Sequence, residues 1–265
     1  MKTETRLALV TGANRGLGLE TARQLLAQGL RVVMTGRDLA AVERARRSLG
    51  PTAGEATAVA MDVTDPASID AAHRTILQKT GAVDVLVNNA AVLLHEGDDV
   101  LSIPADGFRR TFETNLIGAI EACRVFVPAM AERGYGRVVN VSSGAGQLAR
   151  MATYAPAYSI SKTALNAFTR ILAATYRERG VLANAVDPGW VRTKMGGSGA
   201  PVDLDTGQRT QAWLAVSADA EALVSGRYWH HLRQEQPAGE AADPEFQDQL
   251  IDRLSKLTAV ALPEA

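Results

Sequence analysis

The segment that decides the fold is Thr11–Gly18, which reads TGANRGLG and directly follows the apolar run Leu7–Val10. The apolar run predicts a buried β-strand, and the residues from Leu17 to about Gln28 have the spacing of a helix. Glycine lets the backbone turn tightly and approach a ligand closely. The first turn of a helix presents unpaired N–H groups and a partial positive charge. Strand, turn and helix together predict a site for the pyrophosphate of a dinucleotide, although an ordinary strand–helix loop is the alternative.

Beyond this turn the chain alternates short apolar runs with longer amphipathic segments. The pattern predicts strands at 6–11, 31–35, 56–61, 83–87, 137–141, 182–186 and 227–230. Helices are expected at 17–28, 39–49, 106–132, 157–179 and 205–216, and a further one begins at Pro66. This alternation predicts an α/β protein with a single-domain Rossmann fold, in which a doubly wound parallel β-sheet carries helices on both faces.

Residues 1–265 are expected to form one dinucleotide-binding and catalytic domain, because no linker, repeat or low-complexity segment divides them. A substrate loop is expected at about 190–217, where the strand and helix pattern loosens. A C-terminal extension is expected at about 234–265, and Asp243 and Pro244 open an amphipathic helix pattern within it.

The composition disfavours several classes of partner. Lys and Arg number 28 against 29 for Asp and Glu, so no excess of positive charge suggests nucleic acid or an anionic membrane. No apolar stretch approaches the roughly 20 residues that a spanning helix needs. The lone Cys123 cannot form an internal disulfide, which favours a reducing, cytoplasmic location. The four histidines lack the spacing of metal ligands, so no metal is expected.

Further motifs follow the glycine turn in a fixed order. They are Asn88-Asn89-Ala90-Ala91, Asn115, Ser142-Ser143, Tyr158 with Lys162, and Pro188-Gly189. Over roughly the first 195 residues this series resembles the short-chain dehydrogenase/reductase family. The resemblance implies hydride transfer between a nicotinamide cofactor and a carbonyl or alcohol carbon. The Thr11–Gly18 turn and the segment 188–193 are most similar to those of NADPH-dependent carbonyl reductases.

Four residues are expected to be catalytic: Asn115, Ser143, Tyr158 and Lys162. Tyr158 and Lys162 are four residues apart, hence on one helix face. A free tyrosine has a pKa near ~10, and we expect the lysine and an oxidised nicotinamide to lower it. The phenol then exchanges a proton with the substrate oxygen. The resemblance implies that Ser143 holds that oxygen while Ser142 bonds locally to the backbone. It also implies that Asn115 holds a water beside the lysine or satisfies a helix kink.

The resemblance implies a larger set of cofactor contacts along the chain. Asp62 is expected at the adenine, with a turn cap as the alternative, and Asn88 with Ala90 at the ribose, while Asn89 either contacts the cofactor or holds the sheet together. Val191 and Thr193 are expected at the nicotinamide carboxamide. The full expected set is Gly12, Asn14, Arg15, Gly16, Leu17, Gly18, Arg37, Asp62, Val63, Asn89, Ala90, Tyr158, Lys162, Pro188, Gly189, Val191 and Thr193.

The end of the second predicted strand favours NADP(H) over NAD(H). An NAD enzyme usually has a carboxylate there for the ribose hydroxyls, and this chain has Gly36-Arg37 instead. Arg37 is suited to a 2′-phosphate because its guanidinium is always charged and binds in a fork. Arg15, inside the glycine turn, can add a second cation. Asp38 is open to two interpretations, as a cap of the next helix or as a residue that tolerates NAD.

These features together predict NADPH-dependent reduction of a ketone or aldehyde. The alternatives are an NADP-binding sensor without turnover, an alcohol dehydrogenase working mainly in the oxidative direction, and a nucleotide-sugar epimerase or dehydratase. A hydrophobic small-molecule substrate is expected from Leu93, Leu94, Leu148, Tyr154, Trp190 and Met195. The short spacing between Ser143 and Tyr158 lacks the insertion of monomeric carbonyl reductases, which favours a homodimer or homotetramer.

Overall fold

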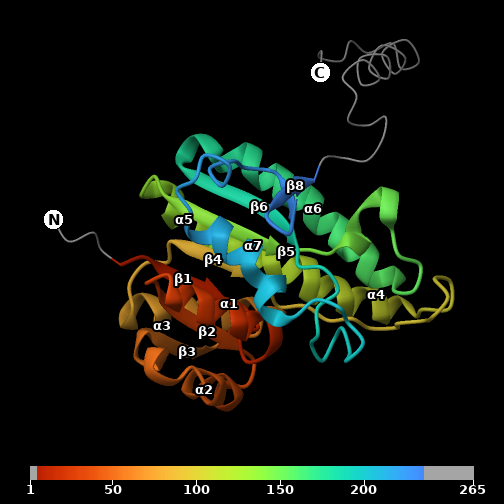
Figure 1. Ribbon diagram of the computed structural model, residues 1–265, viewed down its shortest axis with the longest axis horizontal. Helices are drawn as coiled ribbons and strands as arrows, with labels where there is room; N and C mark the ends of the chain where they lie inside the picture. Colours follow the sequence, from red (N-terminus) through yellow and green to blue (C-terminus); the bar gives the residue numbers. More distant parts are fainter. Residues whose placement is uncertain (1–4, 236–265) are drawn as a thin grey trace, which may run out of the picture. The chain divides into compact units, whose positions relative to one another are not determined.

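A computed structural model describes residues 5–235 and shows one mostly parallel sheet of eight strands in the order β3-β2-β1-β4-β5-β6-β7-β8 (Figure 1). Each neighbouring pair from β3 to β7 is parallel. The strands are β1 (Leu7–Val10), β2 (Arg31–Gly36), β3 (Ala56–Ala60), β4 (Val85–Asn88), β5 (Gly136–Val141), β6 (Val181–Asp187), β7 (Tyr228–His230) and β8 (Arg233–Glu235). The doubly wound sheet that the sequence predicts is confirmed.

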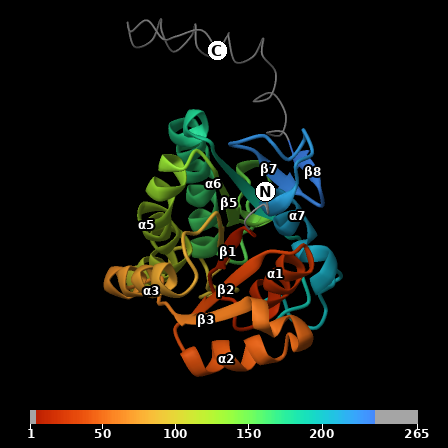
Figure 2. The same cartoon turned by 90° about the vertical axis from the view of Figure 1, so that its left-hand side faces the viewer.

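Helices cover both faces of the sheet (Figure 2). The helices α1 (Gly16–Ala27), α2 (Leu39–Arg47) and α7 (Leu204–Val216) pack on one face. The other face carries α3 (Pro66–Lys79), α5 (Gly118–Glu132) and α6 (Pro156–Tyr176). The helix α4 (Ala105–Phe112) precedes α5, and short 3₁₀ turns lie at Gly50–Glu55, Gly144–Gly146, Leu148–Arg150 and Arg177–Arg179.

The strand sequences account for the two cores. In β1, Leu7 and Leu9 belong to the core beneath α3, α5 and α6, while Ala8 and Val10 belong to the core beneath α1 and α7. Side chains alternate between the faces of a strand, so a strand buried on both sides is apolar throughout. Each face contributes a separate hydrophobic core, and the sheet lies between them.

The helix expected at 106–132 is divided in the structure. The π-helical turn Glu113–Ile117 separates α4 from α5 and carries the buried side chain of Asn115. Such single π-turns within α-helices are frequent at functional sites. Periodicity alone did not reveal this interruption, because the helical pattern continues through it.

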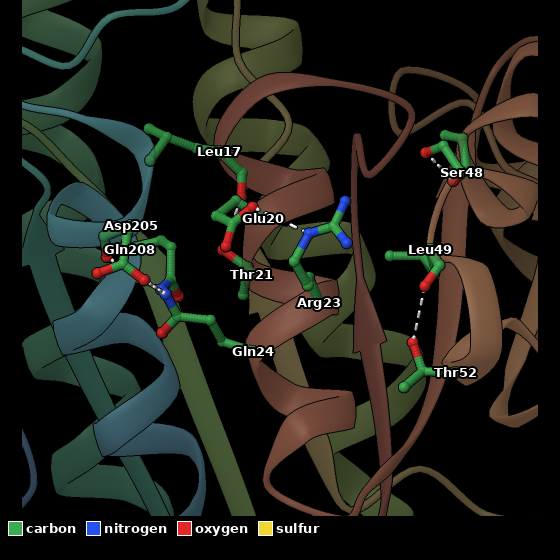
Figure 3. A network of polar contacts seen from close by, with 11 residues as sticks. Leu17, Glu20, Thr21, Arg23, Gln24, Ser48, Leu49, Thr52, Asp205 and Gln208 are labelled. Carbon is green, nitrogen blue, oxygen red and sulfur yellow. Dashed lines mark hydrogen bonds and ion pairs between the residues drawn. The ribbon is translucent and has the colours of Figure 1, made fainter.

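Helices α1 and α7 are tied by polar side chains at their contact (Figure 3). Gln24 Nε2 donates to Asp205 Oδ1 at 2.8 Å, and Thr21 Oγ1 donates to Gln211 Oε1 at 2.8 Å. Gly207 on α7 is close to Val191, whose Cγ2 would lie 2.5 Å from an added Cβ. The substrate loop expected at about 190–217 therefore includes α7, and α7 holds the 190–203 segment beside the start of α1.

The described chain up to Arg233 forms one compact unit. The extension expected at about 234–265 lies almost entirely outside the described residues, as does the helix expected after Pro244. None of the helices within residues 5–235 is both long and apolar enough to span a bilayer.

Gly18 is the position where the fold tolerates a side chain least near the glycine turn. A Cβ there would lie 2.5 Å from both Asn89 Nδ2 and the Gly12 carbonyl oxygen. Gly18→Ala should lower the free energy of unfolding by about 2–4 kcal/mol, because the added methyl displaces a hydrogen-bonded amide. Denaturant unfolding measures this. Gly54→Ala is the control, since no atom lies within 4 Å of its Cβ position. Equal stability of the two variants would contradict the predicted close packing.

Candidate active site

The glycine turn at the end of β1 has the shape of an anion site. Gly12 and Gly16 have φ of +64° and +56°, a region that favours glycine. No side chain of the described residues caps α1, whereas α2, α3 and α7 are capped by Asp38, Asp65 and Asp203. The first N–H groups of α1 are thus left for a ligand, and an aspartate there would repel phosphate. This cradle fits a dinucleotide pyrophosphate.

A hydrogen-bond set joins this turn to the end of β4. The Thr11 hydroxyl accepts from the N–H groups of Asn89 and Ala90, both at 2.9 Å. The Asn89 side chain donates to the carbonyls of Thr11 and Gly12 at 2.8 and 3.3 Å. Asn89 therefore holds the sheet together, as one of the two interpretations of the sequence had it. Ala90 lies beside Gly12, and its expected contact with the ribose stays a prediction.

Asn88 does not lie where the sequence analysis expected it. Its side chain is buried beneath α5 and α6, and Nδ2 donates to Asn140 Oδ1 at 2.8 Å. Asn140 in turn donates to Thr169 Oγ1 at 2.8 Å. The expectation of a ribose contact is wrong for Asn88, because alternate residues of a strand point to opposite faces and this one points into the core.

The ends of β2 and β3 carry the residues expected near the adenosine. Arg37 and Arg15 are exposed. Asp38 caps α2 by accepting from the Ala41 N–H at 3.2 Å, which supports the cap interpretation. Asp62 accepts from both the N–H and the hydroxyl of Thr64, at 2.9 and 2.8 Å. Asp62 is thus a turn cap here, and Val63, next to it, is buried against α5 at Gly118.

Tyr158, Ser143 and Lys162 come together where β5 ends and α6 begins. Burial raises the pKa of Tyr158 to about 12, and a hydrogen bond with Ser143 acts in the opposite direction. Lys162 Nζ lies 5.6 Å from the Tyr158 ring centroid and donates to the Val141 carbonyl at 2.7 Å. Burial lowers the pKa of Lys162 to about 7. In the chain by itself, desolvation of the phenolate outweighs the hydrogen bond from Ser143. The lowering of the Tyr158 pKa by the lysine together with an oxidised nicotinamide stays a prediction.

Ser142 and Asn115 form hydrogen bonds with the segments around Tyr158 and Lys162. Ser142 Oγ donates to Asn166 Oδ1 on α6 at 2.6 Å, so its main bond is not the local backbone contact expected. Asn115 accepts from the Val92 N–H at 2.8 Å and donates to the Val92 carbonyl at 2.9 Å and to Ser161 Oγ at 3.1 Å. Asn115 therefore joins the loop after β4 to α6, the helix that carries Tyr158 and Lys162.

The segment after β6 closes the site opposite the glycine turn. The Val191 backbone pairs with that of Val202, and Thr193 Oγ1 accepts from the Gly196 N–H at 3.0 Å. The Thr193 methyl would lie 3.7 Å from a Cβ added to Gly16. The two segments that the resemblance assigned to the pyrophosphate and the nicotinamide therefore face each other.

A cavity of about 680 Å³ lies between these segments, a size typical of small-molecule sites. Ser143 and Tyr158 line it together with Leu17 and Thr193. Of the six apolar residues expected, four border the cavity: Leu93, Tyr154, Trp190 and Met195. Leu94 and Leu148 lie outside it, and Leu148 is mostly exposed. Within residues 5–235 no group of three or more potential metal ligands occurs.

Sequence reasoning missed Asp187, the last residue of β6. Its carboxylate lines the cavity, accepts from the Gly189 N–H at 2.9 Å and lies 3.2 Å from His230 Nδ1. Burial acts to raise the pKa of Asp187, but hydrogen bonds from His230, Gly189 and Gly144 lower it below its usual value. A charged residue at the end of a mostly apolar strand is the signal that could have identified it.

The chain is similar in sequence to known proteins. A family model described as short chain dehydrogenase matches residues 6–201. The chain is 38% identical over 189 residues to galactitol 2-dehydrogenase (L-tagatose-forming) from Cereibacter sphaeroides, an alignment that covers 71% of this chain and 72% of that protein.

Two solved structures of reductases have a similar fold. The 3-ketoacyl-(acyl-carrier-protein) reductase from Brucella melitensis, complexed with NADH, has a TM-score of 0.78 and 27% identity, covering 85% of this chain and 96% of its own. NADPH-bound carbonyl reductase from chicken fatty liver has a TM-score of 0.76 and 29% identity, covering 86% and 97%. Because the family model matches well over half of the residues, this chain belongs to the short-chain dehydrogenase/reductase family of nicotinamide-dependent oxidoreductases.

Proposed function

We propose that this protein reduces a ketone or aldehyde to an alcohol with NADPH, and that Tyr158 is the general acid. The observation that carries the proposal is the cavity that Tyr158 and Ser143 share with Leu17 and Thr193. Leu17 belongs to the glycine turn and Thr193 to the segment opposite it. A bound nicotinamide would supply the hydride at this place, beside a phenol able to supply the proton.

The neutral form of the Tyr158 phenol is the form that can donate a proton in carbonyl reduction. With a pKa of about 12 in the chain by itself, the phenol is protonated at neutral pH and ready to donate. Ser143 is suited to hold the substrate oxygen, because its hydroxyl already hydrogen-bonds to the Tyr158 phenol.

Lys162 is proposed to hold the nicotinamide ribose and to favour proton release from Tyr158 when charged. Its side chain is buried, and its pKa of about 7 makes its charge sensitive to what binds beside it. Hydroxyl acceptors of a ribose would favour the ammonium form. A buried lysine is costly for the fold, and such groups are retained mostly where they act. This argues against a sensor without turnover.

We infer a preference for NADP(H) from the charges at the end of β2. Arg37 and Arg15 are both exposed and able to pair with a 2′-phosphate. Asp38 accepts an N–H of its own helix, so its carboxylate is engaged as a cap. Asp62, after β3, is likewise engaged with Thr64. The proposed adenosine end therefore offers two exposed cations, while Asp38 and Asp62 already accept hydrogen bonds.

The cavity lining favours a hydrophobic carbonyl substrate. Leu93, Trp190 and Met195 border it beyond the Ser143–Tyr158 pair, and Trp190 is 60% exposed. Trp190 Nε1 donates to the Gly196 carbonyl at 2.8 Å, which fixes the indole. The fixed aromatic face of Trp190 suits a hydrocarbon ring or hydrocarbon chain better than a polyol such as galactitol. We further propose a cytoplasmic homodimer or homotetramer.

Removing the Tyr158 hydroxyl tests the assignment of the acid. Tyr158→Phe should lower kcat by about 10²- to 10⁴-fold, since the proton donor is lost, while NADPH affinity stays within a few fold. Steady-state NADPH oxidation with a panel of hydrophobic ketones, and fluorescence titration of NADPH, measure the two effects. Tyr176→Phe, at the other end of α6 and away from the cavity lining, is the control and should keep turnover. Normal turnover by Tyr158→Phe would refute the mechanism.

Reversing the charge at Arg37 tests the coenzyme preference. Arg37→Asp should raise KM for NADPH by about 10- to 150-fold, because a charge-assisted contact is replaced by repulsion, and KM for NADH should change much less. Kinetics with both coenzymes give the ratio. Arg47→Asp makes the same charge change at an exposed position at the other end of α2. If the ratio of the KM values for NADPH and NADH changed equally in both variants, the assignment of Arg37 to the 2′-phosphate would be contradicted.

Replacing Lys162 with an apolar side chain should separate stability from activity. The pKa of Lys162 is lowered in the folded state, so the unfolded chain binds more protons between about pH 7 and 10.5 and stability rises with pH there. Lys162→Met should remove this rise and, at pH 7, increase the free energy of unfolding by about 1–3 kcal/mol, with turnover lost. Urea unfolding at pH 7 and 9 measures both effects. A destabilised variant would indicate that Lys162 serves the fold.

A further inference from the structure

A small hollow lies at the carboxyl-terminal end of α6, apart from the cavity that contains Tyr158. Its volume is about 180 Å³, and none of its lining residues borders the larger cavity. Small-molecule sites begin at ~300 Å³, so a hollow of this size suits an ion or one group of a larger molecule. Three of its seven lining residues are arginines, namely Arg170, Arg177 and Arg227, and none is acidic.

Helix α6 presents two of these arginines on one face. Arg170 and Arg177 are seven residues apart, which is two helical turns, and the backbone at Arg177 is still helical with φ of −55° and ψ of −50°. The residues between them on this face are Ala173 and Ala174, which line the floor of the hollow. The hollow therefore forms where two long cationic side chains flank two methyl groups.

The turn before β7 brings the third arginine to the helix. Gly226 has φ of +76°, and a Cβ there would lie 3.3 Å from Ala173 Cβ, so the turn lies close against α6. The Gly226 N–H donates to the Ala183 carbonyl of β6 at 2.7 Å, and the Arg227 N–H donates to Asn184 Oδ1 at 3.0 Å. Asn184 is buried and also donates to a backbone carbonyl of this turn at 2.8 Å. A ligand would therefore find the backbone of the hollow already ordered.

The positive charges of the hollow are not balanced within residues 5–235. The side chains of Arg170, Arg177 and Arg227 are exposed, and none makes an ion pair with a carboxylate of that part of the chain. Ser225 Oγ accepts from the Ala183 N–H at 3.0 Å, while its own proton has the Ala183 carbonyl only at 3.5 Å, a long contact. The Ser225 hydroxyl is thus able to donate to a ligand, and the hollow offers three cations and a donor.

We propose that this hollow binds a phosphate group, either as the free ion or as the monoester of a small molecule. The fork of a guanidinium matches the oxygens of a tetrahedral oxyanion. A phosphate group carries about −1.5 to −2 charges at neutral pH, so it balances three cations better than a carboxylate does. The dipole of α6 favours cations in its last turn, but it does not account for Arg227, which comes from another segment.

The proposed phosphate site is separate from the catalytic site. It lies beside Ala183 near the start of β6, whereas Asp187 at the end of the same strand lines the catalytic cavity. A phosphate group bound in the hollow would therefore leave the places proposed for the cofactor and the substrate open. The inference does not depend on the proposed function.

Titration calorimetry of the full chain saturated with NADPH tests the proposal. NADPH is added because the glycine turn is itself suited to bind phosphate. Inorganic phosphate and methyl phosphate are the probes, and acetate is the carboxylate control. At low salt we expect a Kd below about 1 mM for at least one phosphate probe and binding at least about 10-fold weaker for acetate. The tighter of the two phosphate probes shows whether the site takes the free ion or the ester.

Substitution of the arginines shows whether the phosphate binds in the hollow. Arg170→Gln and Arg227→Gln should each weaken binding by about 10-fold or more, because a charge-assisted contact is lost. Arg47→Gln removes an exposed arginine from the last turn of α2 and is the matched control. The proposal would be overturned if neither phosphate probe bound, if the three variants bound phosphate equally, or if acetate bound as tightly.

Ala174→Glu places a carboxylate in the hollow and gives a test of opposite sign. Ala174 is exposed, and its position is four residues from Arg170 and three from Arg177, so the new carboxylate can pair with both. With NADPH present, phosphate at about ten times its Kd should raise the Tm of the wild type by about 3–6 °C. Ala174→Glu should have a higher Tm without phosphate and no response to it.

Ala174→Gln is the control for this variant, since it has the same shape without the charge. It should not raise the Tm in the absence of phosphate. An equal rise in Tm for both variants, or an undiminished phosphate response in Ala174→Glu, would contradict the site. A failure of NADPH to bind would count against the proposed function alone, because the arginine and alanine variants would still report on the hollow.

Discussion

The Thr11 hydroxyl and the Asn89 amide form the contact on which the carboxyl edge of the sheet depends. Thr11 accepts from two N–H groups of the loop after β4, and Asn89 donates to two carbonyls of the glycine turn. This set joins β1 to β4, the strands between which the chain reverses its direction across the sheet. The glycine turn and the loop after β4 both begin at this hydrogen-bond set, so the set fixes the distance between them. Gly18 is required because the Asn89 amide occupies the space of its missing side chain.

Burial dominates the chemistry of the site. Tyr158 is shifted toward its neutral form, and Lys162 likewise, because neither charge is well solvated. Asp187 alone of these three is shifted toward its charged form, because His230 and two backbone N–H groups donate to it. The site therefore holds one hydrogen-bonded carboxylate, Asp187, and two groups, Tyr158 and Lys162, whose charged forms are disfavoured. A cation that binds there would change the pKa values of these groups. An oxidised nicotinamide is such a cation.

Much of this arrangement follows from local pattern. The alternation of apolar runs and amphipathic segments predicts each strand from β1 to β7, and Tyr158 and Lys162 are one helical turn apart in any α-helix. The π-turn at Asn115 was hidden because its side-chain pattern matches that of a continuous helix. The orientation of Asn88 could not be predicted either, since one residue of register decides whether a strand-end side chain enters the core or the cavity.

The sequence by itself determined the class of fold, the place of the glycine turn and the family of the chain, because these depend on periodicity and on motifs that act over a few residues. Only the tertiary structure decided what surrounds each ionisable group. Asp187, Gly144 and His230 are far apart along the chain and meet because β5, β6 and β7 lie side by side. A pKa depends on burial and on such neighbours, and both arise when distant strands are placed in one sheet.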